Sequence, residues 1–444
     1  MSTRRSLLPV YRLAMRGLGW LAPALLHWRL ARGKEDPARM HEKTGIASLP
    51  RPAGHLAWLH GASVGESISL LPLVEQLAAR GLTVLVTTGT VSSARILADR
   101  LGPKALHQYA PLDVPRFVER FLAHWRPDLV LIAESEIWPN LFCATHSAGV
   151  PLVMVSARLS ERSFGRWQKF PATIASILSR VDLCLAQTHV DSLRLRGLGA
   201  PRVQVAGNLK YDVPALPADS AEVAGLEAAI GARPVWIAAS THAGEEAMAG
   251  EAHRLLAKRF PDLLTIIAPR HVARAEPTGR ALAQTGLRVG LRSQQVPVSD
   301  QLDIYMADTM GELGLFYRLS NVVYLGKSAD TGEFVAGGQN PIEPSKLGNA
   351  ILHGPLVENF AEVYSLLDTA GGGLAVANAA ELADGLAALF ADRRRLRAMA
   401  RAAQETVHRF GGASARIMLA MEPYLMQMQI AAGRQTDIAA NQKN

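Results

Sequence analysis

The chain has 444 residues, 49% of them hydrophobic, so it is too long for one ordinary core and two domains are expected. Its formal net charge is +8, but residues 1–51 hold ten Lys and Arg against three Asp and Glu, so they carry seven of those charges. Residues 52–444 are nearly balanced, which argues against a nucleic-acid groove along the body and favours an anionic surface met by the N-terminus.

Residues 6–30 are rich in Leu, Trp and Ala but are interrupted by Arg12 and Arg16. The uninterrupted part, residues 17–28, has twelve residues, and a helix that crosses a bilayer needs about twenty. Its tryptophans suit the headgroup boundary and the arginines suit anionic lipid. We therefore expect a basic amphipathic segment that lies in the membrane interface. The alternative is a helix packed on the body of the protein.

A strand, a loop and a helix are expected in succession between His55 and Leu77. Residues 55–59 form a short apolar run, residues 61–65 a small-residue loop, and apolar residues then recur at three- and four-residue steps in a helix that begins at Glu66. In an open α/β sheet such a loop lies at the carboxyl end of the strands, where ligands bind. Glu66 has two interpretations: an acid that complements the helix dipole, or a general base at a cleft.

Further strands are expected in the first half, separated by helical stretches of ten or more residues: 82–87, 128–133, 151–156 and 182–187. This alternation indicates a parallel, doubly wound sheet. Glu134 and Glu136 follow the 128–133 strand, where they could share a face and hold a metal. However, Pro139 and Asn140 resemble the start of a helix, which the two acids could cap.

The second half follows a proline-containing linker, residues 213–220. Its opening, Trp236-Ile-Ala-Ala-Ser-Thr-His-Ala-Gly-Glu245, repeats the pattern of Trp58-Leu-His-Gly-Ala-Ser-Val-Gly-Glu66 with one extra residue. Later strands are expected at 263–268, 287–291, 303–306, 321–325 and 351–353. The sequence thus predicts two similar α/β domains with a cleft between them.

Polar loops follow several strands of the second half, and loops at the carboxyl ends of one sheet converge on one edge. In Gly337-Gly-Gln-Asn-Pro-Ile-Glu-Pro344 the two glycines can let the backbone approach a ligand, Asn340 can cap a helix, and Pro341 suits its first position. A helix start of this kind can bind phosphate, and Glu343 can accept hydrogen bonds from sugar hydroxyls. Arg270 supplies a fixed positive charge for a phosphate or a carboxylate.

Several signatures are missing: GxxxxGK[ST], GxGxxG and Asp-x-Asp. Their absence disfavours P-loop enzymes, nicotinamide dehydrogenases and metal-dependent sugar transferases. Cys143 and Cys184 are far apart and form no CxxC pair, so neither a disulfide framework nor a zinc site is suggested. A reducing, cytoplasmic setting fits this cysteine usage.

The ordered set of motifs resembles the bacterial 3-deoxy-D-manno-octulosonic acid (Kdo) transferases, which are GT-B glycosyltransferases. The likeness covers nearly the whole chain. The motifs are the basic apolar N-terminus, His60-Gly-Ala-Ser-Val-Gly-Glu66, Thr87-Thr-Gly-Thr90, Glu134-Ser-Glu-Ile-Trp-Pro-Asn140, Ser156-Ala-Arg-Leu-Ser160, Ser240-Thr-His-Ala-Gly-Glu-Glu246, Ala268-Pro-Arg-His271, Asp308-Thr-Met-Gly-Glu-Leu313 and Gly337-Gly-Gln-Asn-Pro-Ile-Glu-Pro344. One departure is Gln339, where the family often has His.

The resemblance implies a GT-B fold of two Rossmann-like domains facing a central cleft, with an N-terminal membrane-associated helix. It implies transfer of Kdo from CMP-Kdo to the lipid A precursor, lipid IVA, with inversion and without a metal or other cofactor. The enzyme would lie on the cytoplasmic face of the inner membrane, with an anionic lipid surface as partner and no nucleic acid. We expect a membrane segment at 1–34, an acceptor domain at 35–212, the linker at 213–220, a CMP-Kdo domain at 221–405 and, at 406–444, a C-terminal helix on the N-terminal domain.

The resemblance also implies the site. Glu66 is the expected general base. The expected donor-binding residues are Arg270, Met310, Gly311, Asn340 and Glu343, with Ser240 and Thr241 beside the phosphate. Residues expected to meet the acceptor or support the base are Ser63, Glu134 and Glu136.

Two other kinds of function remain open from the sequence. One is a different GT-B protein, such as another sugar transferase or a nucleotide-sugar epimerase, although an epimerase needs no membrane-seeking N-terminus. The other is a membrane-bound nucleotide sensor without activity, which the intact Glu66 disfavours.

Overall fold

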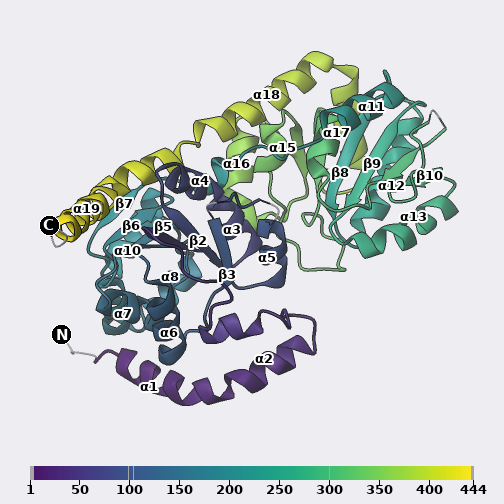
Figure 1. Ribbon diagram of the computed structural model, residues 1–444. Helices are drawn as coiled ribbons and strands as arrows, with labels where there is room; N and C mark the ends of the chain where they lie inside the picture. Colours follow the sequence, from purple (N-terminus) through teal and green to yellow (C-terminus); the bar gives the residue numbers. More distant parts are fainter. Residues whose placement is uncertain (1–4, 99, 104, 300, 442–444) are drawn as a thin grey trace. The chain divides into compact units, whose positions relative to one another are not determined.

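The computed structural model describes residues 5–441 apart from 99, 104 and 300 (Figure 1). The chain forms two compact units. Unit 1 comprises Met1–Val213 and Phe410–Asn444, and unit 2 comprises Pro214–Arg409. Each unit is built around its own parallel sheet.

The sheet of unit 1 has seven parallel strands in the order β3-β2-β1-β4-β5-β6-β7. The strands are β1 (Leu56–His60), β2 (Thr83–Thr88), β3 (Ala105–Tyr109), β4 (Leu129–Ala133), β5 (Leu152–Ala157), β6 (Leu183–Ala186) and β7 (Val203–Val205). The order reverses direction at β1 and β4, so the loops after these two strands flank the switch point where doubly wound sheets bind ligands.

Helices cover both faces of this sheet. They are α3 (Val64–Ser69), α4 (Leu71–Ala79), α5 (Val91–Ala98), α6 (Pro115–Trp125), α7 (Pro139–Ser147), α8 (Glu161–Trp167), α9 (Pro171–Leu178), α10 (His189–Gly197) and α19 (Ala413–Asn441). Leu56 and Trp58 of β1 pack in one core, whereas Ala57 and Leu59 pack in another with residues of α4 and α19. Successive strand residues point to opposite faces, and burial on both faces explains why β1 reads as a continuous apolar run.

The helix expected to begin at Glu66 is different in the structure. It begins two residues earlier, at Val64, with Ser63 as its N-cap, and it ends at Ser69. The apolar periodicity continues into α4 as a separate helix, whose first turn contains Pro72. Proline lacks an N–H and is tolerated only in the first turn, so one periodic stretch becomes two helices.

Unit 2 repeats the architecture, with seven parallel strands in the order β10-β11-β9-β8-β12-β13-β14. The strands are β8 (Val235–Thr241), β9 (Leu264–Pro269), β10 (Val289–Leu291), β11 (Ile304–Met306), β12 (Val322–Leu325), β13 (Ala350–His353) and β14 (Gly373–Ala375). The helices are α11 (Ser220–Ile230), α12 (Glu245–Ala257), α13 (Ala275–Gln284), α14 (Leu313–Arg318), α15 (Ile342–Lys346), α16 (Ala361–Thr369), α17 (Ala379–Ala391) and α18 (Arg393–Arg409). Here the switch point lies between β8 and β12.

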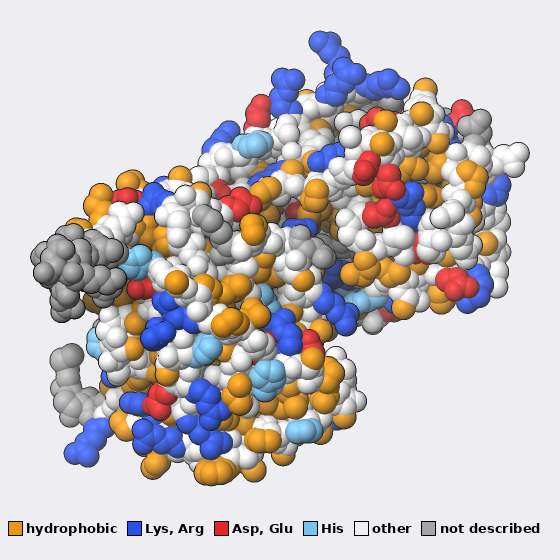
Figure 2. Space-filling view, in the orientation of Figure 1, with side chains coloured by type: hydrophobic (Ala, Val, Ile, Leu, Met, Phe, Trp, Pro, Cys, Tyr) orange, Lys and Arg blue, Asp and Glu red, His pale blue; other side chains and the backbone are white. Residues whose placement is uncertain are grey.

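The N-terminal segment forms two helices joined by a single turn: α1 (Leu8–Leu18), η1 (Gly19–Leu21) and α2 (Ala22–Leu30), which lie along one side of unit 1 (Figure 1). One face packs on the body through Leu8, Ala22 and Leu26, so the alternative of a packed helix is correct for that face. The other face exposes large apolar side chains: Leu7, Val10, Leu13, Leu18, Trp20, Leu21, Leu25 and Trp28. Figure 2 shows hydrophobic side chains together with Lys and Arg side chains over this part of the molecule.

Specific contacts fix this segment to unit 1. The Tyr11 hydroxyl donates to Asp113 Oδ2 at 2.9 Å, and Arg116 Nη2 donates to the Gly19 carbonyl at 2.7 Å. A Cβ on Gly19 would lie 2.7 Å from Val114 Cγ1, so the turn between the helices approaches the body where only glycine fits. None of the helices formed by the described residues has both the length and the apolar character that crossing a bilayer requires.

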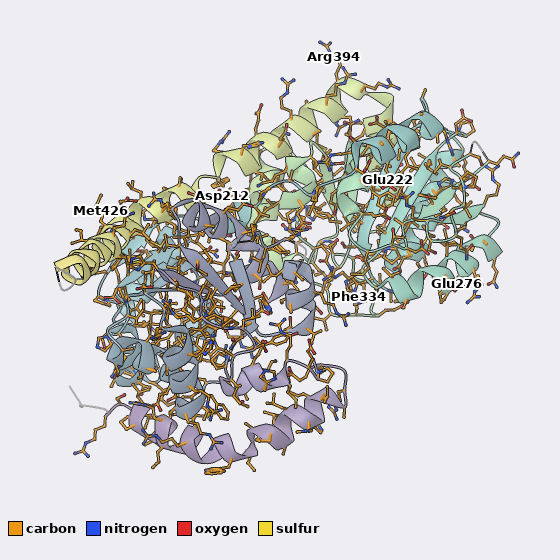
Figure 3. All side chains as sticks on the ribbon, in the orientation of Figure 1. Asp212, Glu222, Glu276, Phe334, Arg394 and Met426 are labelled. Carbon is orange, nitrogen blue, oxygen red and sulfur yellow. The ribbon has the colours of Figure 1, made fainter. Side chains whose placement is uncertain are left out.

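The last helix of the chain returns to unit 1. Residues Ile417, Met418, Met421 and Leu425 of α19 pack in the same core as β1 and α4. Asp212, labelled in Figure 3, accepts hydrogen bonds from the backbone N–H groups of Gly412 and Ser414 and so fixes the start of this helix.

Candidate active site

Glu66 lies at the carboxyl edge of the first sheet, in the first turn of α3. Its Oε2 accepts from the Ala62 N–H at 2.8 Å, and its Oε1 accepts from the Ser63 hydroxyl at 2.9 Å. Ser63 Oγ in turn accepts from the Glu66 N–H at 3.3 Å. This reciprocal arrangement resembles a capping box, and it fixes the carboxylate without neutralising it, because both donors are uncharged. Ser63 therefore supports Glu66 directly.

Glu134 and Glu136 follow β4 and lie next to the loop that carries Glu66. Glu134 has φ +53° and pairs with Lys210, whose Nζ lies 2.6 Å from Oε1. Glu136 Oε2 accepts from Trp138 Nε1 at 2.7 Å. Burial, followed by the charges of Glu66 and Glu134, raises the pKa of Glu136. Glu66 and Glu134 thus lie close enough to Glu136 to act on it electrostatically.

The expectation that these acids cap the following helix is wrong. The N-cap of α7 is Trp138, which makes no side-chain cap bond. Asp113 satisfies this helix start instead, since its carboxylate accepts from the N–H groups of Asn140 at 3.1 Å and Leu141 at 2.8 Å. The same carboxylate binds Tyr11 of α1, so Asp113 joins the N-terminal segment to the strand-end loops. Among the described residues, no group of three or more His, Cys, Asp or Glu side chains has an arrangement suited to a metal ion.

Four of the seven predicted donor residues meet at the carboxyl edge of the second sheet. Ser240, Arg270, Met310 and Gly311 line a pocket of about 90 Å³, together with Ala268, Pro269, Val272, Ala307, Thr309, Leu313 and Phe316. Ser240 has φ +54° and Gly311 φ +86°, both in the left-handed region, and the Met310 side chain is 81% exposed. The Arg270 N–H donates to the Thr241 carbonyl at 2.9 Å, which fixes the start of the arginine loop.

Basic side chains surround this edge. Burial, then electrostatic interactions with His271, Lys327, Arg270 and Arg274, lower the pKa of His242 to about 4. The His242 ring is therefore neutral at pH 7, and it packs against the rings of His271 and Phe334, the latter labelled in Figure 3. Gln339 Nε2 lies 3.2 Å from His242 Nε2, so the departure from the family pattern places a hydrogen-bonding amide beside this imidazole. The edge is suited to an anion.

Thr241 does not share the environment of Ser240. It is fully buried, and its hydroxyl donates to Glu246 Oε1 at 3.1 Å. Arg274 Nη2 lies 3.2 Å from the other oxygen of Glu246. The side chain of Thr241 is thus engaged inside unit 2, and its backbone carbonyl is what reaches the arginine loop.

The loop at residues 337–344 differs from its expected form. The N–H groups of Gly337 and Gly338 both donate to the Lys327 carbonyl, at 2.8 and 2.7 Å, so these glycines serve a tight internal turn rather than an open approach to a ligand. The helix α15 begins at Ile342 and has only five residues. Pro341 is its N-cap rather than its first residue, although Asn340 Oδ1 still accepts from the Ile342 N–H at 3.0 Å.

Asn340 and Glu343 do not line the pocket around Arg270. Both side chains are partly exposed, and the charge of Glu343 contributes, after burial, to raising the pKa of Tyr317. A larger cavity of about 500 Å³ lies at the opposite edge of the same sheet, near Pro234 and Asn321, and none of the predicted site residues lines it. The arginine pocket is therefore the more relevant space.

Lys210 and Asp113 are the functional candidates that sequence reasoning missed. Lys210 lies in η3 (Leu209–Tyr211), 76 positions after the carboxylate that it pairs with. Nothing in the spacing of the sequence indicates this pair. His242 lies in the sequence motif Ser240-Thr-His-Ala-Gly-Glu-Glu246, but its neutral state follows from burial and from the surrounding charges, which the motif does not show.

Comparison with known proteins agrees with this geometry. Residues 38–213 match the family model described as 3-deoxy-D-manno-octulosonic-acid transferase (kdotransferase). The chain is 34% identical over 437 residues to the 3-deoxy-D-manno-octulosonic acid transferase of Bordetella pertussis, which covers 94% of this chain and 99% of the relative. It is 32% identical over 408 residues to the transferase of the same name from Haemophilus influenzae, with coverage of 90% and 94%.

Solved structures support the fold. A putative UDP-N-acetylglucosamine 2-epimerase from Listeria monocytogenes superposes with a TM-score of 0.58 at 17% identity, covering 84% of this chain and 98% of the epimerase. Together with the two doubly wound parallel sheets, this likeness confirms the predicted GT-B class of two Rossmann-like domains. The identity over nearly the full length of the curated relatives shows that the chain belongs to the family of 3-deoxy-D-manno-octulosonic acid (Kdo) transferases and is a glycosyltransferase.

Proposed function

We propose that this protein transfers Kdo from CMP-Kdo to the lipid A precursor, lipid IVA, at the cytoplasmic face of the inner membrane, with inversion and with Glu66 as general base. The observation that carries the proposal is the pocket at the basic edge of unit 2, where Ser240, Arg270, Met310 and Gly311 converge. Membership of the Kdo transferase family supplies the sugar that is transferred.

The basic edge of unit 2 is suited to the leaving group. As the bond between Kdo and CMP breaks, negative charge develops on the phosphate, and fixed positive groups lower the energy of that state. Arg270 lies in the pocket, and its positive charge, with those of Lys327 and Arg274, contributes to lowering the pKa of His242 at the same edge. We propose that these side chains supply the positive charge that a metal ion provides in other transferases.

Glu66 is suited to the proton transfer. Each of its oxygens accepts one neutral donor, which leaves lone pairs for an acceptor hydroxyl. The hydroxyl oxygen forms a bond to the anomeric carbon of Kdo while the bond from that carbon to the phosphate breaks, so CMP leaves with the electron pair. The hydroxyl proton passes to Glu66. Attack on the face opposite the phosphate inverts the anomeric centre.

Product analysis tests the proposal. The purified full-length chain is incubated with CMP-Kdo and lipid IVA, and the lipid is examined by mass spectrometry and NMR. We expect an increase in mass by Kdo units and an anomeric configuration opposite to that of the donor. Transfer with retained configuration would contradict the single displacement. Turnover of CMP-Kdo without any modified lipid would contradict the proposed acceptor.

The exposed face of α1, η1 and α2 is the proposed membrane contact. Leu13 is 70% exposed and Trp20 is 77% exposed, and burying one large apolar side chain contributes roughly 1.5–3 kcal/mol. We expect the double substitution Leu13→Gln and Trp20→Gln to weaken binding to anionic vesicles at least ~10-fold in a sedimentation assay. Leu193→Gln is the matched control, because Leu193 is 69% exposed on α10. Equal losses in both variants would exclude this face as the contact.

A further inference from the structure

A buried ion pair joins the N-terminal helices to the sheet edge that carries Glu66. Arg29 of α2 pairs with Glu35, which follows that helix. Glu35 is only 5% exposed, and its Oε2 lies 2.7 Å from the Nζ of Lys43, which is 4% exposed. Burial lowers the pKa of Lys43, and the interaction with Glu35 opposes that effect. The pair therefore holds a charge where isolated charges are costly.

Lys43 connects this pair to the loop after β2. Its Nζ donates to the Gly89 carbonyl at 2.9 Å, and the Gly89 N–H donates to the Ala62 carbonyl at 3.1 Å. A Cβ on Gly89 would lie 3.1 Å from that same oxygen, so the two loops touch directly. The Ala62 N–H donates to Glu66 Oε2 at 2.8 Å. One residue, Ala62, thus makes both the contact with the Glu66 carboxylate and the contact with Gly89.

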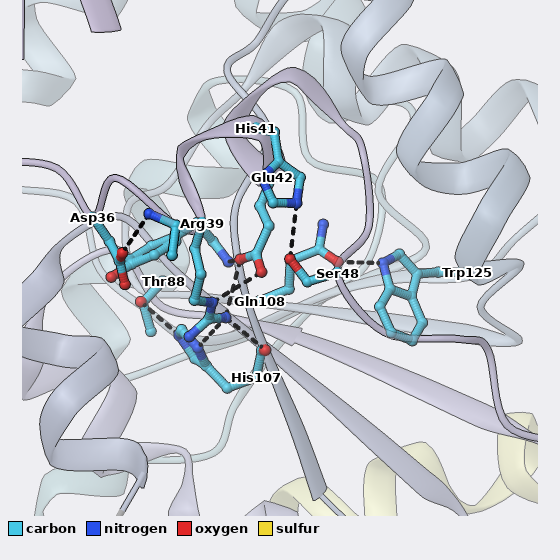
Figure 4. Close-up of polar contacts among 11 residues, drawn as sticks. Asp36, Arg39, His41, Glu42, Ser48, Thr88, His107, Gln108 and Trp125 are labelled. Atoms are coloured by element: carbon cyan, nitrogen blue, oxygen red, sulfur yellow. Dashed lines mark hydrogen bonds and ion pairs between the residues drawn. The ribbon is translucent and has the colours of Figure 1, made fainter. Parts of the chain in front are cut away.

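The backbone around Lys43 is itself fixed. Arg39 pairs with Glu42 at 2.9 Å and donates to the His107 carbonyl at 2.9 Å (Figure 4). Glu42 Oε2 accepts from the Tyr109 N–H at 2.7 Å. These contacts attach η2 (Met40–Thr44) to the end of β3, so the ammonium group of Lys43 is held from both its backbone and its side chain.

Stability alone is a poor explanation for this arrangement. A buried ion pair contributes little net stability compared with apolar residues of the same volume, although removing one partner is costly. A polar chain that ends at a half-exposed carboxylate can instead set the position of that carboxylate, and position within about 0.5 Å matters for catalysis.

We propose that Glu35 and Lys43 are positioning residues for Glu66, which hold the loop at Ala62 and connect it to α2, so that binding of α1 and α2 to lipid steadies the Glu66 carboxylate. This inference rests on the proposed roles of Glu66 and of the N-terminal helices. It adds that the acceptor-side loop is most ordered when the enzyme is on the membrane, where the lipid acceptor is found.

Hydrogen exchange on the full-length protein tests the connection independently of catalysis. We compare the wild type with Lys43→Met, which keeps the length of the side chain but removes its donor, and with Lys43→Arg as the conservative rescue. We expect exchange in residues 61–66 and 87–90 to be about tenfold faster in Lys43→Met and near wild type in Lys43→Arg. Arg80→Met is the control, because it removes an exposed ion pair, with Glu422, from the same unit.

The variant Arg29→Gln tests the link to the membrane. It removes the pair of Arg29 with Glu35 but leaves the buried pair of Glu35 with Lys43 in place. Anionic vesicles should slow exchange at residues 61–66 in the wild type, and this slowing should be lost in Arg29→Gln. If Lys43→Met does not fold, Glu35→Gln serves as the second test of the pair, with the same expected increase in exchange.

Kinetics separate a positioning role from a structural one. For Lys43→Met we expect kcat to fall about tenfold or more while KM for CMP-Kdo stays within twofold. If hydrogen exchange at residues 61–66 is unchanged in Lys43→Met and Glu35→Gln, the inference is overturned, whatever the transfer activity of Glu66→Gln. If exchange is faster in Lys43→Met but Glu66→Gln is fully active, the connection between the loops is supported. The proposed role of Glu66 as general base is then contradicted. An equal effect of vesicles on the wild type and Arg29→Gln would overturn the link to α2.

Discussion

The two units share one sheet topology but carry side chains of opposite charge at the carboxyl edge of the sheet. At the carboxyl edge of unit 1 the polar groups near the switch point are the acids Glu66, Glu134 and Glu136, with Lys210 paired to one of them. At the carboxyl edge of unit 2 the charged groups are Arg270, Arg274 and Lys327, which surround the neutral His242. Because the topologies correspond, the difference lies in the loops. A repeated scaffold thus carries acidic loops in one unit and basic loops in the other, as the proposed roles of proton acceptor and anion site require.

The repeated Gly-Glu motif shows how far the two loops have diverged in role. Glu66 is partly exposed and accepts two hydrogen bonds from its own loop. Glu245, its counterpart after β8, is fully buried and accepts from the N–H groups of His242, Lys327, Ser328 and Ala329 at 2.7–3.1 Å. The first carboxylate is partly open to solvent, whereas the second holds the loop after β12 against the start of α12.

The largest effect should follow from removing the acid of unit 1. We expect Glu66→Gln to lower the rate of transfer roughly 10²-fold to 10⁴-fold, the usual contribution of a general base. The amide keeps the acceptor oxygen for one of the two neutral donors, so the thermal midpoint should change little. Single-turnover kinetics with CMP-Kdo and the lipid acceptor measure this effect. Near-normal turnover would remove Glu66 from the mechanism.

Removing the arginine of unit 2 should affect the donor instead. We expect Arg270→Ala to raise KM for CMP-Kdo about 10-fold to 100-fold, because a charge-assisted contact to phosphate is lost. Arg280→Ala is the matched control, since Arg280 is an exposed arginine on α13 that pairs only at the surface with Glu276. A similar KM for both variants would show that the phosphate lies elsewhere.

The buried counterpart of the motif should affect stability. In Glu245→Gln an NH₂ group replaces an oxygen that accepts backbone N–H groups, so we expect unfolding of unit 2 to become easier by about 3 kcal/mol. Urea denaturation measures the loss, and Glu405→Gln on the exposed face of α18 provides the control. If Glu245→Gln lowered turnover without any loss of stability, the two glutamates would not differ as the contacts indicate.

A pH-dependent effect on stability should appear in both units. Burial lowers the pKa of His60 in unit 1 and of His253 in unit 2 from 6.5 to about 4. Between these values the unfolded chain binds a proton that the folded chain does not, so stability falls as pH decreases from about 6.5 to about 4. His60→Gln should reduce this pH-dependent loss of stability by up to ~3 kcal/mol. If the free energy of unfolding changed by the same amount between pH 7 and pH 4.5 in His60→Gln and in the wild type, His60 would be charged in the folded state.

Much of the fold could be predicted because patterns among residues close in the sequence indicate its strands and helices. The apolar runs of the long central strands, such as Leu129–Ala133, and the helical stretches between them indicated two doubly wound sheets. The strands that were missed lie toward the sheet edges. Ala105–Tyr109 is only partly apolar, and Val203–Val205 and Gly373–Ala375 have three residues each, too few to show a period. The break before Pro72 was missed because apolar spacing continues across it.

The candidate site was partly predictable for the same reason. Ser240 lies at the end of β8, Arg270 directly follows β9, and Glu66 follows β1 after a short loop, so topology alone brings them to a sheet edge. The pairing of Lys210 with Glu134 and the capping of α7 by Asp113 depend on contacts between distant segments. The internal turn at Gly337 and Gly338 depends on the Lys327 carbonyl, which no spacing in the sequence indicates.

The division of roles between the two edges is the central claim, and CMP calorimetry on three full-length proteins tests it most directly. We expect the wild type and Glu66→Gln to bind CMP with equal affinity, although Glu66→Gln transfers Kdo far more slowly, and Arg270→Ala to bind about 10-fold to 100-fold more weakly. Equal affinity of Arg270→Ala and the wild type, or a matching loss in Glu66→Gln, would contradict the claim that the acid and the nucleotide site belong to different domains.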